Sequence, residues 1–130
     1  MDNKFLILYN PVSSNRKSLK ILQKLKDDFD RLNFKYHIIQ TEHPKHMTEL
    51  CSTNTSYKKV IIIGGDGTFN EAINGIMINS HNEEQSFGFL PGGTGNSFLY
   101  DLGGQKYSKA IEIIINGRFK KIDILKLEFS

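Results

Sequence analysis

The segment Gly-Gly-Asp-Gly-Thr at residues 64–68 carries the residue types best suited to chemistry in this 130-residue chain. It follows an apolar run at residues 60–63, and a helix-like pattern begins at Phe69. A buried strand that turns through glycines into a helix presents backbone N–H groups to an anion such as phosphate. Asp66 is the one acidic group of the segment, and a carboxylate repels phosphate. We therefore expect Asp66 to handle Mg²⁺ or to position a nucleotide.

The two glycines beside Asp66 have an expected role of their own. A side chain at Gly65 or Gly67 would block phosphate from reaching the backbone, and we expect these glycines to adopt positive φ angles that other residues avoid. A plainer interpretation is also open, because Thr68 and Glu71 fit a capping box with Thr68 as the N-cap of a helix. On that interpretation the glycines only make a tight turn.

Two further strand-like runs end in loops rich in glycine, hydroxyl and amide groups. Residues 87–90 lead into Pro-Gly-Gly-Thr-Gly-Asn at residues 91–96, and residues 5–9 lead into Asn-Pro-Val-Ser-Ser at residues 10–14. In parallel α/β sheets, ligands bind at the carboxyl ends of the strands. Three such loops at one edge favour a phosphate-binding site over a purely structural turn.

Apolar patterns alternate between strand and helix along the chain. We expect strands at residues 4–9, 36–40, 59–63, 86–90 and 121–129, and helices at residues 16–33, 44–52, 69–79 and 108–116. One face of the first helix is apolar and carries Leu22, Leu25, Phe29 and Leu32. The alternation predicts an α/β fold, a three-layer αβα sandwich with a mainly parallel sheet covered on both faces.

Three motifs, in this order, resemble those of a known family. They are Asn10-Pro11-x-Ser13; Gly64-Gly65-Asp66-Gly67-Thr68 followed by Asn70-Glu71; and Pro91-x-Gly93-Thr94-x-Asn96. Together they are similar to the catalytic domain of diacylglycerol kinases and related lipid kinases, which include sphingosine and ceramide kinases. The resemblance implies that residues 1–130 form the N-terminal ATP-binding domain, similar to that of NAD kinases and diacylglycerol kinases. It also implies that a C-terminal β-rich lipid-binding domain is absent from this chain.

The same resemblance implies roles for individual residues. ATP is the implied phosphoryl donor, Mg²⁺ the implied metal, and a lipid hydroxyl of the diacylglycerol or sphingoid type the acceptor. The implied nucleotide contacts are Asn10, Pro11, Val12, Ser13, Ser14, Thr41, Gly64, Gly65, Asp66, Gly67, Thr68, Phe69, Asn70, Thr94 and Asn96. Asp66 is also the implied catalytic residue, and with Asp123 it would hold Mg²⁺ indirectly, through water. The family's general base lies in the absent domain, so the isolated chain is expected to be inactive.

Some features depart from the family or favour another function. Ser97 stands where bacterial diacylglycerol kinases have aspartate. A non-acidic residue at this position is closer to the sphingosine-kinase branch. The glycine segment alone also resembles that of NAD kinases and phosphofructokinases, and a non-catalytic nucleotide-binding module stays an alternative. The sequence contains no Gly-Lys-Ser/Thr, which excludes a Walker-type loop. His43 and His46 are three residues apart, but the sequence offers no convincing further ligand, so we predict no zinc site.

Composition and charge indicate the cellular location and the partners to expect. The formal net charge is +3, and no apolar stretch approaches the roughly 20 residues of a membrane span. We expect a cytoplasmic protein that meets its lipid substrate at the inner membrane face and has no nucleic-acid partner. The single cysteine, Cys51, suits a reducing compartment and is expected to be buried beside Met47 and Leu50. The apolar strand pattern at residues 121–129 is expected to pair two copies of the chain into a homodimer.

Overall fold

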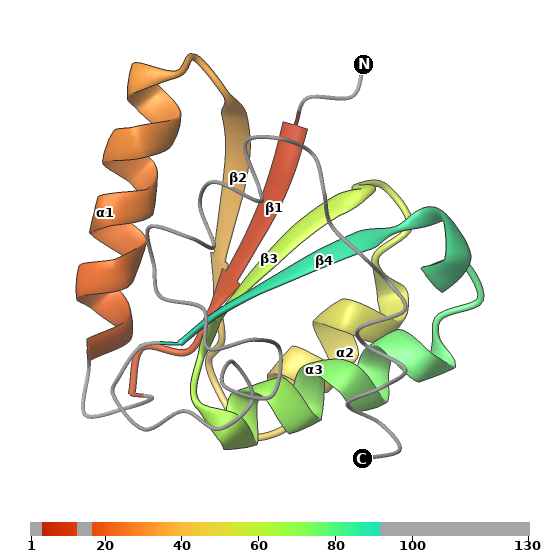
Figure 1. Cartoon of the computed structure of the whole chain (residues 1–130). Helices are drawn as coiled ribbons and strands as arrows, with labels where there is room; N and C mark the ends of the chain where they lie inside the picture. Colours follow the sequence, from red (N-terminus) through yellow and green to blue (C-terminus); the bar gives the residue numbers. More distant parts are fainter. Residues whose placement is uncertain (1–3, 13–16, 92–130) are drawn as a thin grey trace.

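The computed structural model of the protein describes residues 4–12 and 17–91 (Figure 1). Its elements in chain order are β1 (Lys4–Tyr9), α1 (Lys17–Arg31), β2 (Lys35–Gln40), α2 (His46–Thr53), β3 (Lys59–Gly64), α3 (Asp66–Ile78), the 3₁₀ helix η2 (Asn82–Glu84) and β4 (Ser86–Pro91). The strands expected in this part of the chain are confirmed, each to within one residue at either end. The strand expected at residues 121–129, the homodimer expected from it and the helix expected at residues 108–116 lie outside the described residues.

The described strands form one parallel sheet in the order β2-β1-β3-β4. β1 pairs with β2 on one side and with β3 on the other, and β4 pairs with β3. The chain therefore moves outward from β1 to β2 and then crosses to the opposite side of β1 for β3 and β4. The direction reverses between β1 and β3. In open parallel sheets this switch point, at the carboxyl ends of the strands, is where ligands bind.

Apolar side chains fill both faces of the sheet. One cluster joins sheet residues to α1 and contains Phe5, Ile7, Tyr9, Leu22, Leu25, Phe29, Ile61, Ile63 and Leu90. The other joins the opposite sheet face to α2 and α3 and includes Leu6, Leu8, Met47, Val60, Ile62, Phe69, Ile73, Phe87 and Phe89. Thus α1 covers one face, and α2 with α3 covers the other (Figure 1). The predicted α/β fold with αβα layers is confirmed in the described part of the chain.

The apolar stripe of α1 explains how this helix docks on the sheet. Three of its four predicted stripe residues, at spacings of three and four, are buried: Leu22, Leu25 and Phe29. The fourth, Leu32, lies just after the helix and is half-buried. The ring of Phe29 lies with its centroid 4.8 Å from that of Phe5 in β1. The helix ends at Arg31, two residues before the predicted end. Asn33 follows with a φ of 61°, a left-handed conformation that stops a right-handed helix.

The start of α3 differs from the prediction. The helix begins at Asp66, three residues before Phe69, and its N-cap is Gly65, without a side-chain cap. The predicted N-cap role of Thr68 is therefore wrong. The physical reason is a tertiary contact, because the Thr68 hydroxyl accepts a hydrogen bond from Asn10 rather than capping its own helix.

The start of α2 also differs from the prediction. This helix begins at His46, two residues after the expected start at Pro44, and runs to Thr53. Lys45, between Pro44 and His46, has a φ of 68°, in the left-handed region. A right-handed helix cannot include that conformation, so the helix starts one residue later.

α2 and α3 approach each other closely at a glycine. A Cβ added at Gly75 would collide with the backbone carbonyl of Thr48 and would lie 2.8 Å from the Cβ of Cys51. The hydroxyl of Thr48 also donates a hydrogen bond to the carbonyl of Glu71 over 2.8 Å. Cys51 is consequently 3% exposed, and burial raises the pKa of its thiol to about 12. The predicted burial of this cysteine is confirmed.

Candidate functional site

The carboxyl ends of β1, β2 and β3 are held together by backbone hydrogen bonds. The N–H of Asn10, directly after β1, donates to the carbonyl of Ile63 in β3 over 3.3 Å. The N–H of Thr41, directly after β2, donates to the carbonyl of Tyr9 in β1 over 2.9 Å. The structure therefore places Asn10, Thr41 and the glycine segment at one edge of the sheet, as the sequence predicted.

A side-chain hydrogen bond fixes the loop after β1 against the start of α3. Nδ2 of Asn10 donates to Oγ1 of Thr68 over 3.3 Å. Oδ1 of Asn10 accepts the backbone N–H of Val12 over 3.1 Å, which closes a tight turn. Thr68 is buried, so water competes little for its hydroxyl. One amide thus orders its own loop with its oxygen and the first turn of α3 with its nitrogen.

The first turn of α3 directs backbone donors toward the same edge. The N–H of Phe69 donates to the carbonyl of Gly65 over 2.9 Å and opens the helical hydrogen-bond ladder. Helix geometry leaves the N–H groups of residues 67 and 68 without an intrahelical acceptor, and a helix N-terminus favours negative charge. Asp66 lies in this turn and is exposed. A carboxylate and a set of backbone donors therefore share this end of the helix.

Lack of space explains Gly64, and none of the three glycines of the segment is explained by a positive φ. Gly65 has a φ of −111°, and Gly64 and Gly67 lie outside the left-handed region, so the expectation of positive φ at Gly65 and Gly67 is wrong. A Cβ added at Gly64 would lie 2.6 Å from the Cβ of Thr68, so this glycine makes room for Thr68. A Cβ added at Gly67 would meet no atom within 4 Å, so the space beside Gly67 is open.

The other predicted nucleotide contacts differ in their surroundings. Val12 and Asn70 are exposed, and Pro11 is half-buried. The side chain of Phe69 is fully buried, and its ring packs edge-on against Phe89 with the centroids 5.0 Å apart. Phe69 therefore belongs to the core, and we leave its side chain out of the site. Outside the described residues lie Ser13, Ser14, Thr94, Asn96, Ser97 and Asp123.

The contact between Asn10 and Thr68 was not predicted from the sequence. Both residues were predicted to contact the nucleotide, but they are 58 positions apart and no local pattern indicates that they meet. The order of the strands is the signal that was needed. Once β1 and β3 are neighbours, the residue after β1 must lie beside the turn after β3.

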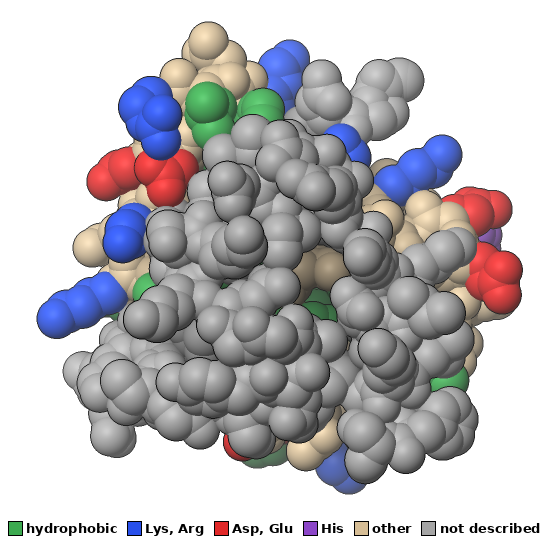
Figure 2. Space-filling view, viewed as in Figure 1, with side chains coloured by type: hydrophobic (Ala, Val, Ile, Leu, Met, Phe, Trp, Pro, Cys, Tyr) green, Lys and Arg blue, Asp and Glu red, His purple; other side chains and the backbone are tan. Residues whose placement is uncertain are grey.

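Figure 2 shows side chains of both charges over α1. Lys20 and Lys24 are exposed on this helix, and so are Asp27 and Asp30. The described side chains of α1 therefore form no single-sign basic patch of the kind that binds nucleic acid.

Within residues 17–91, none of the helices combines the length and the apolar character that crossing a membrane requires.

The chain resembles known proteins over most of its length. Residues 4–127 match the family described as the diacylglycerol kinase catalytic domain. A diacylglycerol kinase of Staphylococcus carnosus (strain TM300) is 31% identical, across 93% of this chain and 40% of its own length. The sphingoid long-chain bases kinase 1 of Arabidopsis thaliana is 29% identical, across 97% of this chain and 18% of its own length.

A solved structure shares the architecture. The crystal structure of a diacylglycerol kinase from Bacillus anthracis str. Sterne superposes with a TM-score of 0.68 and 26% identity, and the match covers 88% of this chain and 42% of that one. This chain thus spans less than half the length of each of these relatives. The family match, the shared fold and the ordered motifs agree, and the chain belongs to the diacylglycerol kinase catalytic domain family.

Proposed function

We propose that the chain is the nucleotide-binding domain of a lipid kinase that transfers the γ-phosphoryl group of ATP to a lipid hydroxyl. The relatives are named as kinases of diacylglycerol and of sphingoid bases. The observation that carries the proposal is the hydrogen bond between Asn10 and Thr68. It joins the loop after β1 to the first turn of α3 at the switch point of the sheet. A helix N-terminus at such a switch point is a general binding site for nucleotide phosphate.

The residues at this edge suit a polyphosphate and a magnesium ion. No atom lies within 4 Å of a Cβ added at Gly67, so phosphate can approach the backbone there. The carboxylate of Asp66 is a hard oxygen ligand of the kind that Mg²⁺ prefers, usually with waters in its shell. Bound Mg²⁺ would neutralise phosphate charge during transfer. In this proposal Asp66 and Asp123 order the waters of the metal, and the N–H groups of residues 67 and 68 hold the phosphates.

We further propose that the lipid is held by a part of the protein that these 130 residues do not contain. The relatives are more than twice as long as the stretch they share with this chain. A β-rich second domain would bring the lipid hydroxyl from the membrane surface to the γ-phosphate and would supply the general base. On this proposal the chain alone binds nucleotide without turning it over.

Titration of the chain with MgATP tests the nucleotide site, and Gly67→Ala is the informative variant. Its added methyl group enters open space. Alanine also favours a helix over glycine by about 1 kcal/mol, so the variant should be at least as stable as the parent. We expect MgATP affinity to fall by roughly tenfold or more, about 1.4 kcal/mol, because the methyl group occupies the approach path of the phosphate.

Asn74→Ala is the matched control for this experiment. Asn74 is exposed on the same helix, about two turns after Gly67, and alanine raises helix propensity there as well. This control should bind MgATP like the parent. A Gly67→Ala variant that binds as tightly as the parent would place the phosphate elsewhere. A folded parent that gives no heat at millimolar MgATP would contradict the nucleotide assignment itself.

A further inference from the structure

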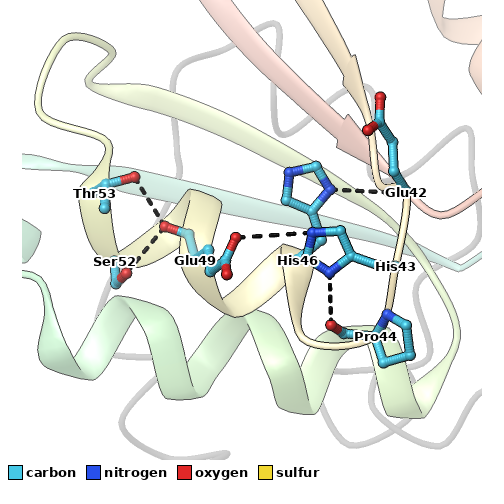
Figure 3. A network of polar contacts seen from close by, with 7 residues as sticks. All are labelled: Glu42, His43, Pro44, His46, Glu49, Ser52 and Thr53. Atoms are coloured by element: carbon cyan, nitrogen blue, oxygen red, sulfur yellow. Dashed lines mark hydrogen bonds and ion pairs between the residues drawn. The ribbon is translucent and has the colours of Figure 1, made fainter.

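We propose that His43, His46 and Glu49 form a zinc-binding site at the start of α2. Each side chain offers one ligand atom, and these atoms lie within 4.8 Å of one another (Figure 3). The sequence pattern offered the two histidines without a third ligand. The structure supplies that ligand, because Glu49 lies about one helical turn after His46 and its carboxylate faces His43.

His43 is oriented as a metal ligand would be. Its Nδ1 lies 2.9 Å from the backbone carbonyl of Pro44. A carbonyl oxygen only accepts, so Nδ1 carries the proton, and in the neutral ring that binds a metal Nε2 carries the lone pair. That Nε2 lies 3.9 Å from Oε1 of Glu49. A carbonyl on the far ring nitrogen is a usual outer partner of a metal-bound histidine, because it fixes both the tautomer and the direction of the ring.

The turn before α2 brings the two imidazoles together. His43 precedes the helix, and Lys45 adopts a left-handed φ of 68° between the histidines. This conformation is strained for a residue with a side chain, and such strain is typical of functional sites. It folds the chain back so that the rings of His43 and His46 stack with their centroids 4.5 Å apart.

His46 would join the metal by turning its ring. Its Nδ1 accepts the backbone N–H of Glu42 over 2.9 Å, and its plane lies within 14° of the His43 plane. Parallel rings direct their lone pairs side by side and not at a common point. A bound metal therefore turns His46 out of the stack and replaces the Glu42 hydrogen bond. His43 and Glu49 are exposed and His46 is half-buried, so the metal would bind at the protein surface.

Two imidazoles and one carboxylate favour zinc over magnesium. Imidazole nitrogen suits zinc and its neighbours in the first transition row, whereas Mg²⁺ prefers an all-oxygen shell. Zinc bond lengths of about 2.0–2.2 Å put tetrahedral ligand atoms about 3.3–3.6 Å apart, and a water can complete the shell. The present 3.9 Å between His43 and Glu49 is close to that separation. Cys51 does not compete for the metal, because its thiol is buried.

Calorimetric titration of the untagged protein with Zn²⁺ at neutral pH tests the site. We expect one Zn²⁺ per chain and a higher Tm with zinc present, and excess Mg²⁺ should not displace the zinc. His43→Gln and Glu49→Gln should each weaken zinc binding by at least about tenfold, because removing even an outer partner of a metal ligand typically costs roughly 10–100-fold. Both residues are exposed, so their replacement should leave the fold intact, which circular dichroism checks.

His37→Gln and His81→Gln are the matched controls, since each removes an exposed histidine from another part of the surface. Both should bind zinc like the parent. The proposal is overturned if the parent binds no zinc, if His43→Gln binds it as tightly as the parent, or if the controls lose as much affinity. None of the substituted residues belongs to the proposed nucleotide site, so this outcome is independent of MgATP binding.

Discussion

The side-chain amide of Asn10 donates a hydrogen bond to the hydroxyl of Thr68 and joins two residues 58 positions apart across the switch point of the sheet. Asn10 follows β1, and Thr68 lies in the helix that follows β3. The two strands are neighbours, with Tyr9 level with Ile63. The bond therefore holds the loop after one strand against the helix after the other. A nucleotide bound between them would depend on this bond, although the bond itself need not touch the nucleotide.

Thr68→Val removes the hydroxyl and keeps the shape of the side chain. A typical intramolecular hydrogen bond contributes about 0.5–1.5 kcal/mol. We therefore expect MgATP affinity to fall by roughly two- to tenfold while the sheet stays folded. Calorimetry measures the affinity, and far-UV circular dichroism checks the fold. Thr68→Ser keeps the hydroxyl and should bind MgATP like the parent.

Asn10→Ala turns this test into a double-mutant cycle. Alone, it should cost more affinity than Thr68→Val, because it also removes the acceptor of the Val12 N–H. Together, the two substitutions should cost less than the sum of their separate losses, since the same bond is removed in both. Strictly additive losses would mean that the two side chains act on the nucleotide separately.

Gly64→Ala tests whether this glycine is needed to make room for Thr68. An added Cβ would lie 2.6 Å from Cβ and Cγ2 of Thr68, well inside normal contact distance. Overpacking of this kind typically costs about 1–3 kcal/mol. We expect a lower midpoint in urea unfolding. Gly67→Ala is the control and should lose no stability, because its Cβ meets no atom within 4 Å. Equal losses at both positions would mean that the segment resists side chains for reasons of backbone conformation.

Local patterns were sufficient to predict the strands and the docking face of α1. Five of the six residues of β1 (Lys4–Tyr9) form an uninterrupted apolar run, residues 5–9, and the burial of Phe29 follows from helical spacing. The start of α3 could not be predicted in the same way. Thr68 and Glu71 fit a favourable capping box, but the helix begins at Asp66 and the Thr68 hydroxyl accepts a hydrogen bond from Asn10. Local propensity gives way there to a bond between distant parts of the chain.

The candidate site was predicted as a set of residues but not as an arrangement. The sequence does not distinguish Gly64, which serves the packing of Thr68, from Gly67, which borders open space. Nor does it indicate that Glu49 faces His43, because that contact depends on the left-handed conformation of Lys45. No propensity rule favours a lysine in that conformation.

In the full-length protein, Asp66→Asn should lower kcat far more than it lowers MgATP affinity. The proposed work of this carboxylate is to order Mg²⁺ and its waters as charge moves during phosphoryl transfer. Such interactions act on the transition state more than on the bound ground state. We expect kcat to fall by about 10²–10³-fold, with an affinity close to that of the parent. Steady-state kinetics and equilibrium titration together decide this, and equal losses would assign Asp66 to nucleotide positioning instead.

The buried Cys51 predicts how stability depends on alkaline pH. Burial raises the pKa of its thiol from 9.0 to about 12 in the folded chain. Above about pH 9 the unfolded chain releases this proton while the folded chain keeps it, so the folded state binds more protons. The contribution of Cys51 is therefore fully present below pH 9 and is lost as the pH rises toward 12. The free energy of unfolding should fall by up to about 1.4 kcal/mol per pH unit in this range, measured by urea unfolding.

Cys51→Ala separates this contribution from those of other titrating groups. The variant lacks the thiol, so its unfolding free energy should decline less steeply above pH 9 than that of the parent. The same burial predicts that a thiol reagent labels the native parent at about pH 8 only through transient opening, far more slowly than it labels the urea-unfolded chain. If the native protein reacts as fast as the unfolded chain, or if the two alkaline slopes coincide, the Cys51 thiol reaches water in the folded state. The packing of α2 on α3 would then be looser than the structure shows, where a Cβ added at Gly75 would lie only 2.8 Å from the Cβ of Cys51.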